Sequence, residues 1–188
     1  MTDQPTALDL PMVDPLPEAT QRYFDICDEK LGFVPNVLRA HAFDIDKLNA
    51  FTALYNDLML APSGLSKLER EMVAVVVSAT NRCHYCLVAH GAAGRQLSGD
   101  PMLGEALITN WRVADVDARM RAMLGFAEKI TLASATIEEA DRQALRDQGL
   151  SDRDIWDLAN VAAFFNMSNR VASATAMVPN PDYHAQAR

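Results

Sequence analysis

Helix-start signals recur along this 188-residue chain, and they constrain its fold more than any other feature. In a capping box, a Ser or Thr and an acidic residue three positions later satisfy each other's free backbone N–H groups where a helix begins. Three such pairs are present: Ser66 with Glu69, Thr136 with Glu139, and Ser151 with Asp154. No run of alternating apolar and polar residues stands between hairpin turns, as strands would require. The sequence therefore predicts an all-α protein.

The same signals, with glycine and proline breaks, set the expected helix boundaries. The capping boxes predict helices over residues 67–81, 137–148 and 152–176. Further helices are expected over residues 17–30, from 35, from 44 to the break at 62–64, over 83–97, from 101, and from 115 or 117 to about 132. The proline-rich residues 1–16 are predicted to form an extended N-terminal arm, and residues 17–188 a single helical domain.

Net charge and hydropathy exclude several classes of partner. The chain carries a formal charge of −8, and no cluster of Lys and Arg is available to neutralise phosphates, so we expect no nucleic-acid partner. Its apolar run over residues 72–79 is far shorter than the roughly 20 residues that span a bilayer, so we expect no membrane partner. Residues 1–20 contain neither a basic start nor an apolar signal core. We therefore expect a cytoplasmic protein.

The stretch "EREMVAVVVSATNRCHYCLVAH", residues 69–90, holds the side chains with chemical potential. Cys83 and Cys86 are separated by two residues, His90 follows four positions after Cys86, and Glu71 lies in an apolar run upstream. With three cysteines in total, the count is odd and two of them are close in sequence, which disfavours a secreted disulfide framework. The pattern indicates a metal site, a redox pair or ordinary core.

Haem attachment and zinc binding are the two metal-centred interpretations. Covalent haem attachment requires His directly after the second cysteine, and Leu87 occupies that position. A structural zinc site needs four ligands, whereas this segment offers three. The fourth would have to come from residues outside any second paired motif: Cys27, His41, His84 or His184. Zinc is therefore disfavoured but stays an alternative, and we expect no metal and no cofactor.

The redox interpretation has a physical basis in helix geometry. If a helix begins near Cys83, both sulfurs lie in its first turn, where unpaired N–H groups and the helix dipole favour a thiolate. His90 is one turn beyond Cys86, so its imidazole can act as a base for that thiol more directly than for Cys83. After oxidation of Cys86, Cys83 is close enough to close a disulfide.

Glu71 is an acidic residue in a helix that is apolar on nearly every face. Burying a carboxylate costs several kcal/mol unless it is paired, so we expect Glu71 to serve as a proton relay to His90 or the thiols. Structural alternatives remain: Glu71 could pair with Arg70, Arg82 or a partner subunit, His90 could be a hydrogen-bonded core residue, and the cysteines could be small core side chains. His84 and Tyr85 could line the site or face solvent.

The spacing Glu71, eleven residues, Cys83, two residues, Cys86, three residues, His90 resembles the signature of AhpD-like alkylhydroperoxidases in the carboxymuconolactone decarboxylase superfamily. The blocks "GFVPNVLRAH" and "FFNMSNRVASATAMVPNPDYH" are similar to those of its peroxidase-related branch, over roughly residues 30–184. This resemblance implies an AhpD-like helical bundle that forms a homo-oligomer, at least a dimer. It also implies that Cys86 attacks the peroxide, Cys83 resolves, His90 is the base and Glu71 its relay partner.

The activity implied by the resemblance is reduction of a hydroperoxide substrate by a dithiol reductant or a redox partner protein such as a lipoylated one. One departure is Tyr85, because the better characterised branch has His immediately before the second cysteine. Lactone decarboxylation is disfavoured, since the decarboxylase branch lacks the cysteine pair. Two alternatives remain: a thiol-disulfide oxidoreductase or electron-transfer adaptor that does not itself reduce peroxide, and a metal-binding or purely structural helical oligomer.

Overall fold

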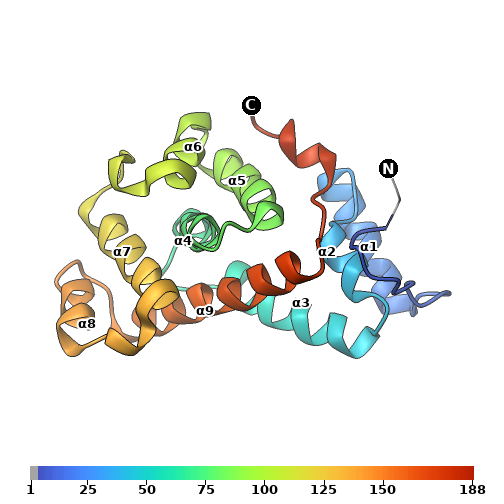
Figure 1. The fold of residues 1–188 in the computed structure, drawn as a ribbon, viewed down its shortest axis with the longest axis horizontal. Coiled ribbons are helices and arrows are strands. Elements are labelled where there is room, and N and C mark those ends of the chain that lie inside the picture. Colours follow the sequence, from blue (N-terminus) through green and yellow to red (C-terminus); the bar gives the residue numbers. More distant parts are fainter. Residues whose placement is uncertain (1–3) are drawn as a thin grey trace.

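The computed structural model describes residues 4–188, and in that range it contains nine α-helices, three short 3₁₀ helices and no strand (Figure 1). The all-α prediction is confirmed. The α-helices are α1 (Glu18–Leu31), α2 (Asn36–His41), α3 (Ile45–Leu60), α4 (Lys67–Thr80), α5 (His84–Ser98), α6 (Pro101–Asn110), α7 (Ala118–Ala133), α8 (Glu139–Arg146) and α9 (Asp152–Ala174). The 3₁₀ helices are η1 (Trp111–Val113), η2 (Ser134–Thr136) and η3 (Pro181–His184).

Two of the three predicted capping boxes form as expected. At the start of α4, the Glu69 N–H donates to the Ser66 hydroxyl at 3.1 Å, and the Ser66 N–H donates to the Glu69 carboxylate at 2.7 Å. The same reciprocal pair, Ser151 with Asp154, begins α9. Each box satisfies two backbone N–H groups that have no partner within the helix.

The third predicted capping box is wrong. Thr136 lies at the end of η2, where its hydroxyl donates to the Ala133 carbonyl at 2.8 Å, and it is not the N-cap of the next helix. Helix α8 begins at Glu139, two residues later than predicted, with Glu138 as its N-cap. The Glu138 N–H donates to the Asp141 carboxylate at 2.8 Å. An acidic pair therefore replaces the expected Thr and Glu.

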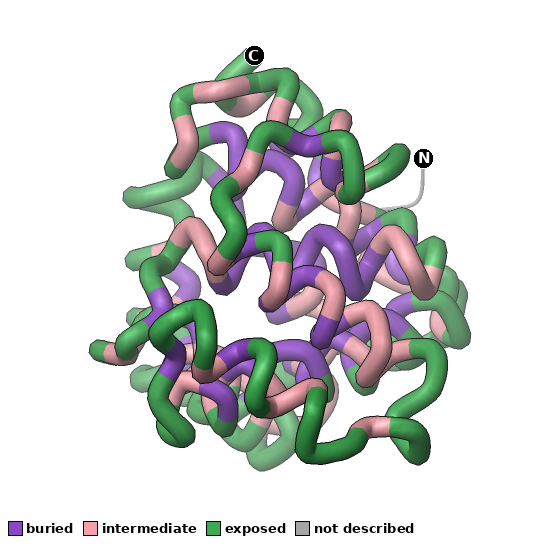
Figure 2. The backbone as a smooth tube through the Cα atoms, turned by 90° about the vertical axis from the view of Figure 1, so that its left-hand side faces the viewer, coloured by how far each residue is buried: buried purple, intermediate pink, exposed green. Residues whose placement is uncertain are grey.

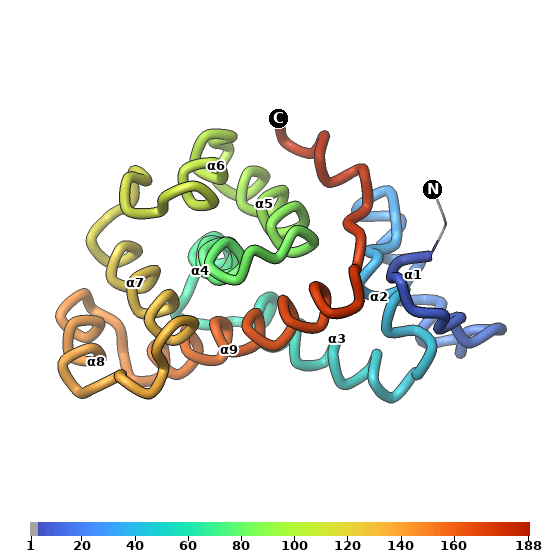
Figure 3. Tube along the Cα trace, viewed as in Figure 1, coloured from blue at the N-terminus to red at the C-terminus, as the bar shows by residue number. Residues whose placement is uncertain are grey.

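Helix α4 lies at the centre of the molecule. In Figure 1 it is seen end-on, with α5, α6, α7 and α9 arranged around it, and it contacts each of them and α3. Every residue from 70 to 78 is buried, which explains why this helix is apolar on almost all faces. Figure 3 shows that the green α4 and the orange-red α9 meet although they are far apart in sequence.

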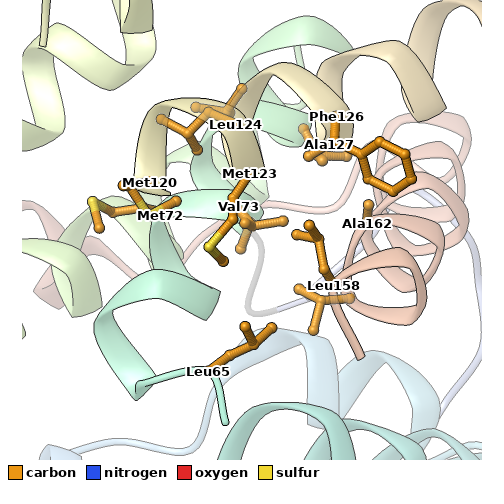
Figure 4. Packing of buried hydrophobic residues seen from close by; sticks show 14 of the residues in the cluster. Leu65, Met72, Val73, Met120, Met123, Leu124, Phe126, Ala127, Leu158 and Ala162 are labelled. Atoms are coloured by element: carbon orange, nitrogen blue, oxygen red, sulfur yellow. The ribbon is translucent and has the colours of Figure 1, made fainter. Parts of the chain in front are cut away.

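The largest apolar cluster fills the space between α4, α7 and α9 (Figure 4). Val73, Met123, Leu124, Ala127 and Leu158 are all completely buried there. Buried segments of the chain lie inside a shell of partly and fully exposed ones (Figure 2). Burial of such side chains contributes roughly 1.5–3 kcal/mol each relative to exposure, so this cluster holds the helices together.

Residues 4–16 and the C-terminal segment pack against the body. Residues 4–16 contain no helix, and the Val13 N–H donates to the Ala42 carbonyl at 2.9 Å. Residues 1–3 of the predicted arm lie outside the described residues. The C-terminal segment runs beside α2, because Asn180 accepts from the Asn36 N–H at 2.7 Å and donates to the Val34 carbonyl at 3.0 Å. In residues 4–188, no helix is both long and apolar enough to cross a membrane.

Candidate active site

The turn between α4 and α5 places the two cysteines. Helix α4 ends in a Schellman motif, in which the Arg82 N–H donates to the Ala79 carbonyl and the Cys83 N–H donates to the Ser78 carbonyl at 2.9 Å. Arg82 has a φ of +54°, the left-handed conformation that this motif requires. The chain therefore turns sharply, so that Cys83 is the N-cap of α5 and Cys86 lies in its first turn.

The two sulfurs form a close, unbridged pair. The Cys83 and Cys86 thiols lie 3.4 Å apart, and each cysteine is only 1% exposed. At this distance one thiol can donate a hydrogen bond to the other once the latter is ionised. The pair can also close a disulfide by a small movement of either side chain, since a bonded pair lies about 2.05 Å apart.

The pKa of Cys83 is lowered to about 6, chiefly because the Cys86 thiol hydrogen-bonds to its thiolate. The backbone N–H of Cys86, the Ser173 hydroxyl and the positive charge of His90 lower this pKa further, while burial opposes them. The Cys86 N–H is one of the free donors at the N-terminus of α5, and the Ser173 hydroxyl comes from the last turn of α9. Cys83 is therefore the thiol that ionises first.

The pKa of Cys86 is raised, for the complementary reason. Its thiol is held protonated by the hydrogen bond that it gives to Cys83, and burial and the negative charge of Cys83 add to the effect. Asn169 and Ser168 of α9 act in the opposite direction, since both hydrogen-bond to Cys86 and lower its pKa. The two cysteines thus share one negative charge, which rests on Cys83.

Glu71 and His90 form a second close pair of polar side chains. The Glu71 carboxylate accepts a hydrogen bond from His90 Nδ1 at 2.7 Å, and the two side chains are 9% and 12% exposed. Because a carboxylate can only accept, Nδ1 carries the proton and Nε2 is free to exchange a proton with other groups. Arg70 is not the partner of Glu71, since its guanidinium donates to the carbonyls of Leu58 and Ala61.

A cavity of about 540 Å³ opens beside these pairs. Its walls come mainly from α1, α3, α5, α9 and the C-terminal segment, and they are predominantly apolar. Cys86 and His90 both lie on the wall, whereas Cys83 is not among the lining residues. Phe165 packs edge-on against His90, with ring centroids 4.5 Å apart, and so fixes the imidazole at the cavity surface. A molecule in this cavity would meet Cys86 before Cys83.

All four tyrosines of the chain line this cavity. Tyr85, at the position where the family resemblance leads one to expect His, is buried, and its hydroxyl accepts from the Val37 N–H at 3.0 Å. Tyr183 hydrogen-bonds to the same Tyr85 hydroxyl. The Tyr23 hydroxyl donates to Asn56 at 3.5 Å. Tyr85 therefore supports the cavity wall, and a proton relay through an imidazole at this position is absent.

The other candidate residues lie apart from the cysteine pair. His84 is exposed, with its ring 6.5 Å from that of His184, and His41 hydrogen-bonds to the Val37 carbonyl. Cys27 is half-buried on the cavity wall in α1. Among residues 4–188, no group of three or more Cys, His, Asp or Glu side chains is arranged to hold a metal ion. Cys27, His41, His84 and His184, the four candidates for a fourth zinc ligand, therefore do not form a metal site with the cysteines.

Sequence reasoning missed the contribution of α9. Asn169 is 1% exposed and donates to the Ser78 hydroxyl at 3.0 Å, while Asn81 donates to its side-chain oxygen at 3.0 Å. This network orients the amide so that its NH₂ group faces α4 and the Cys86 sulfur. The signal available in the sequence was a group of polar residues, Ser168, Asn169 and Ser173, that follows the apolar run over residues 161–165 in the same helix.

Comparison with known proteins places this geometry in a family. The sequence model of the carboxymuconolactone decarboxylase family matches residues 46–129, which include both cysteines, Glu71 and His90. No curated protein matches the chain. A crystal structure of an uncharacterized peroxidase-related protein from Silicibacter sp. TM1040 is 71% identical, with full coverage of both chains and a TM-score of 0.97.

Two further solved structures extend the comparison. An uncharacterized peroxidase-related protein from Ralstonia eutropha JMP134, described as an alkylhydroperoxidase AhpD core, is 40% identical over all of this chain and 98% of its own, with a TM-score of 0.95. The debrominase Bmp8 is 18% identical over 98% of this chain and 96% of its own, with a TM-score of 0.78, so it shares the fold. The chain belongs to the AhpD-like proteins of the carboxymuconolactone decarboxylase superfamily.

Proposed function

We propose that the protein is a thiol-dependent hydroperoxide reductase that works through a Cys83–Cys86 disulfide. One observation carries the proposal: Cys86 and His90 lie together on the wall of an apolar cavity, with the Cys83 sulfur 3.4 Å from that of Cys86. Family membership supports an enzyme with alkylhydroperoxide-related activity. The arrangement provides a nucleophile, a proton donor and a resolving thiol around one space.

The first step is attack on the substrate by Cys86. Its proton passes to the neighbouring Cys83 thiolate, and the Cys86 sulfur attacks the terminal oxygen of the hydroperoxide, RO–OH. The O–O bond breaks, Cys86 becomes a sulfenic acid, and the alkoxide RO⁻ leaves. Protonated His90 gives its proton to the alkoxide, which becomes an alcohol, and Glu71 stabilises the imidazolium before the transfer.

The second step closes the disulfide and restores the enzyme. Cys83 attacks the Cys86 sulfenic sulfur, and the hydroxyl leaves as water with the proton of Cys83. The two electrons that reduce the peroxide therefore come from the two cysteines. A dithiol then exchanges with the Cys83–Cys86 disulfide, leaves as a disulfide itself, and returns both cysteines to the reduced state.

Burial of the cysteines favours this function over the adaptor alternative. Both sulfurs are 1% exposed, and the cavity on which Cys86 lies is enclosed by α1, α3, α9 and the C-terminal segment. A folded partner protein cannot bring its own disulfide to such a thiol without opening these walls. A small hydroperoxide can enter, and so can a dithiol on a narrow arm, such as a lipoyl group on a partner protein.

We also propose that the protein acts as a homo-oligomer, at least a dimer. Large apolar side chains remain on its outer helices, with Met102, Val113, Leu132 and Trp156 each between 68% and 72% exposed. Contact with a second copy would remove such side chains from water. Light scattering at micromolar concentration should give at least twice the mass of one chain, and the mass of a single chain would contradict the proposal.

The test of the main proposal is a balanced single turnover. Reduced protein mixed with one equivalent of cumene hydroperoxide should yield one equivalent of the alcohol and a Cys83–Cys86 disulfide detected by mass spectrometry. Dihydrolipoamide should then support repeated turnover. If the reduced protein leaves the hydroperoxide intact but its disulfide exchanges rapidly with the dithiol, the adaptor function replaces the peroxidase function.

A further inference from the structure

Tyr55 on α3 faces the reactive groups across the cavity. Its ring centroid lies 6.4 Å from that of His90, and both residues line the cavity with Cys86. The ring is held by other aromatic residues: Phe51 stacks on it with centroids 6.4 Å apart, and Phe164 lies 6.0 Å away. Helix α3 therefore presents a fixed phenol ring to the space in which a substrate would meet Cys86.

The Tyr55 hydroxyl differs from those of the other three tyrosines. Tyr23, Tyr85 and Tyr183 each use their hydroxyl in a hydrogen bond within the protein. Tyr55 forms no hydrogen bond with any residue in the range 4–188, and no buried side-chain oxygen or nitrogen in that range lacks a partner. Its hydroxyl is therefore not sealed in the core. It opens onto the cavity that the ring lines, where it can bind a ligand.

The chemistry of this hydroxyl is that of a donor. Its pKa is raised well above the usual value, first by burial and then by the negative charge of Glu71 nearby. The phenol consequently keeps its proton throughout the physiological range. An unpartnered donor in a largely apolar cavity is worth more to a developing negative charge than the same donor in water, because little solvent competes for it.

We propose that the Tyr55 hydroxyl donates a hydrogen bond to the leaving oxygen of the hydroperoxide while Cys86 attacks. This inference rests on the proposed peroxidase function and assigns Tyr55 a role in it. As the O–O bond breaks, the S–O bond forms on Cys86 and negative charge develops on the oxygen that carries the organic group. Tyr55 stabilises that charge by its hydrogen bond and keeps its own proton, while His90 supplies the proton that converts the alkoxide into the alcohol.

Tyr55→Phe tests the proposal, because it removes the hydroxyl and keeps the ring on Phe51. The rate constant for oxidation of the reduced protein should fall about 10- to 100-fold with cumene hydroperoxide, the loss expected for one donor to a developing charge. With a peroxy acid such as 3-chloroperbenzoic acid the fall should be less than about threefold, because a carboxylate is a weak base and depends little on a donor. A structural defect would slow both substrates equally.

Tyr23→Phe is the matched control, because it removes a cavity hydroxyl that is bonded to Asn56. Both substrates should keep their rates within about threefold in that variant. Alkylation of the cysteines by iodoacetamide should be unchanged in Tyr55→Phe, since Tyr55 does not hydrogen-bond to either sulfur. Equal rates of Tyr55→Phe and wild type with cumene hydroperoxide, or equal losses with both substrates, would overturn the inference. Failure of wild type to reduce any peroxide would instead remove the proposed function itself.

Discussion

Two apolar clusters of this protein share α9 but are packed differently. The cluster between α4, α7 and α9 is filled by aliphatic side chains and methionines, many of them completely buried. The cluster around Cys83 and Cys86 is smaller, is made largely of alanine and aromatic side chains, and borders the cavity. In the first cluster the apolar side chains pack against one another, whereas the second cluster borders an open space beside Cys86 and His90. Stability and chemistry are therefore expected to depend on different residues.

Helix α4 shows the division within one element. Its residues Val73 and Val76 are fully buried in the filled cluster. Glu71 and Ser78, on the same helix, bond to His90 and Asn169 beside the cysteines. A buried carboxylate and hydroxyl are tolerated because each has a hydrogen-bond partner, and the apolar surface around them supplies the free energy that holds the partners in place.

The largest effect is expected from Cys86→Ser, which removes the nucleophile and leaves the volume almost unchanged. Turnover of cumene hydroperoxide should fall by at least about a thousandfold, because a Ser hydroxyl is not ionised near neutral pH. Cys83→Ser should also abolish turnover with a dithiol but still consume one peroxide, leaving a Cys86 sulfenic acid that dimedone traps. Wild-type turnover in both variants would rule out the proposed function.

Truncating a side chain in the cluster between α4, α7 and α9 should lower stability but leave turnover unchanged. Leu158→Ala removes a completely buried side chain from the filled cluster and is expected to lower the free energy of unfolding by about 2–5 kcal/mol. The hydroperoxide turnover of each folded molecule should stay close to that of wild type, because Leu158 does not line the cavity. Chemical denaturation and turnover at a temperature below the transition measure the two quantities. A large loss of turnover in the fully folded variant would break the comparison between the clusters.

The pair of Glu71 and His90 should affect activity more than stability. His90→Gln is expected to slow turnover on the order of a hundredfold, because it removes the proton donor. Glu71→Gln should cause a smaller loss, since the amide oxygen can still accept from His90 Nδ1 but no longer stabilises the imidazolium. Thermal midpoints should change little in either variant. A loss of roughly 3 kcal/mol in Glu71→Gln would show that the carboxylate is needed for folding instead.

The sequence was sufficient to predict the elements that depend on local chemistry. Capping side chains act within three residues, so Ser66 and Ser151 gave correct helix starts. Glu71, Cys83, Cys86 and His90 lie on consecutive helices joined by a tight turn, so their spacing alone predicted that they would lie close together. Thr136 does not cap a helix, because it ends the 3₁₀ helix η2 and the next α-helix begins only at Glu139, with Glu138 as its N-cap.

Contacts between distant parts of the chain could not be predicted in the same way. Tyr55 and Asn169 reach the site from α3 and α9, and no local pattern fixes which face of those helices turns toward α5. The location of the resting charge is a further case. Helical spacing pointed to Cys86 as the thiol next to His90. The lowered pKa belongs instead to Cys83, because Cys83 is the N-cap of α5 and its sulfur accepts a hydrogen bond from the Cys86 thiol.

The smallest expected effect concerns the negative charge on Cys83. The pKa of Cys83 is about 6. The rate at which iodoacetamide alkylates Cys83 in the reduced protein should therefore be low below pH 6 and rise as the pH passes through 6. Ser173→Ala removes one hydroxyl that favours the thiolate, so the midpoint should move to higher pH, by up to about one unit. Thr175→Ala is the control, because its hydroxyl bonds to the Val171 carbonyl, and its midpoint should not move. An unchanged alkylation midpoint in Ser173→Ala would show that the Ser173 hydroxyl does not stabilise the Cys83 thiolate. The Cys86 thiol and the Cys86 backbone N–H would then account for the lowered pKa.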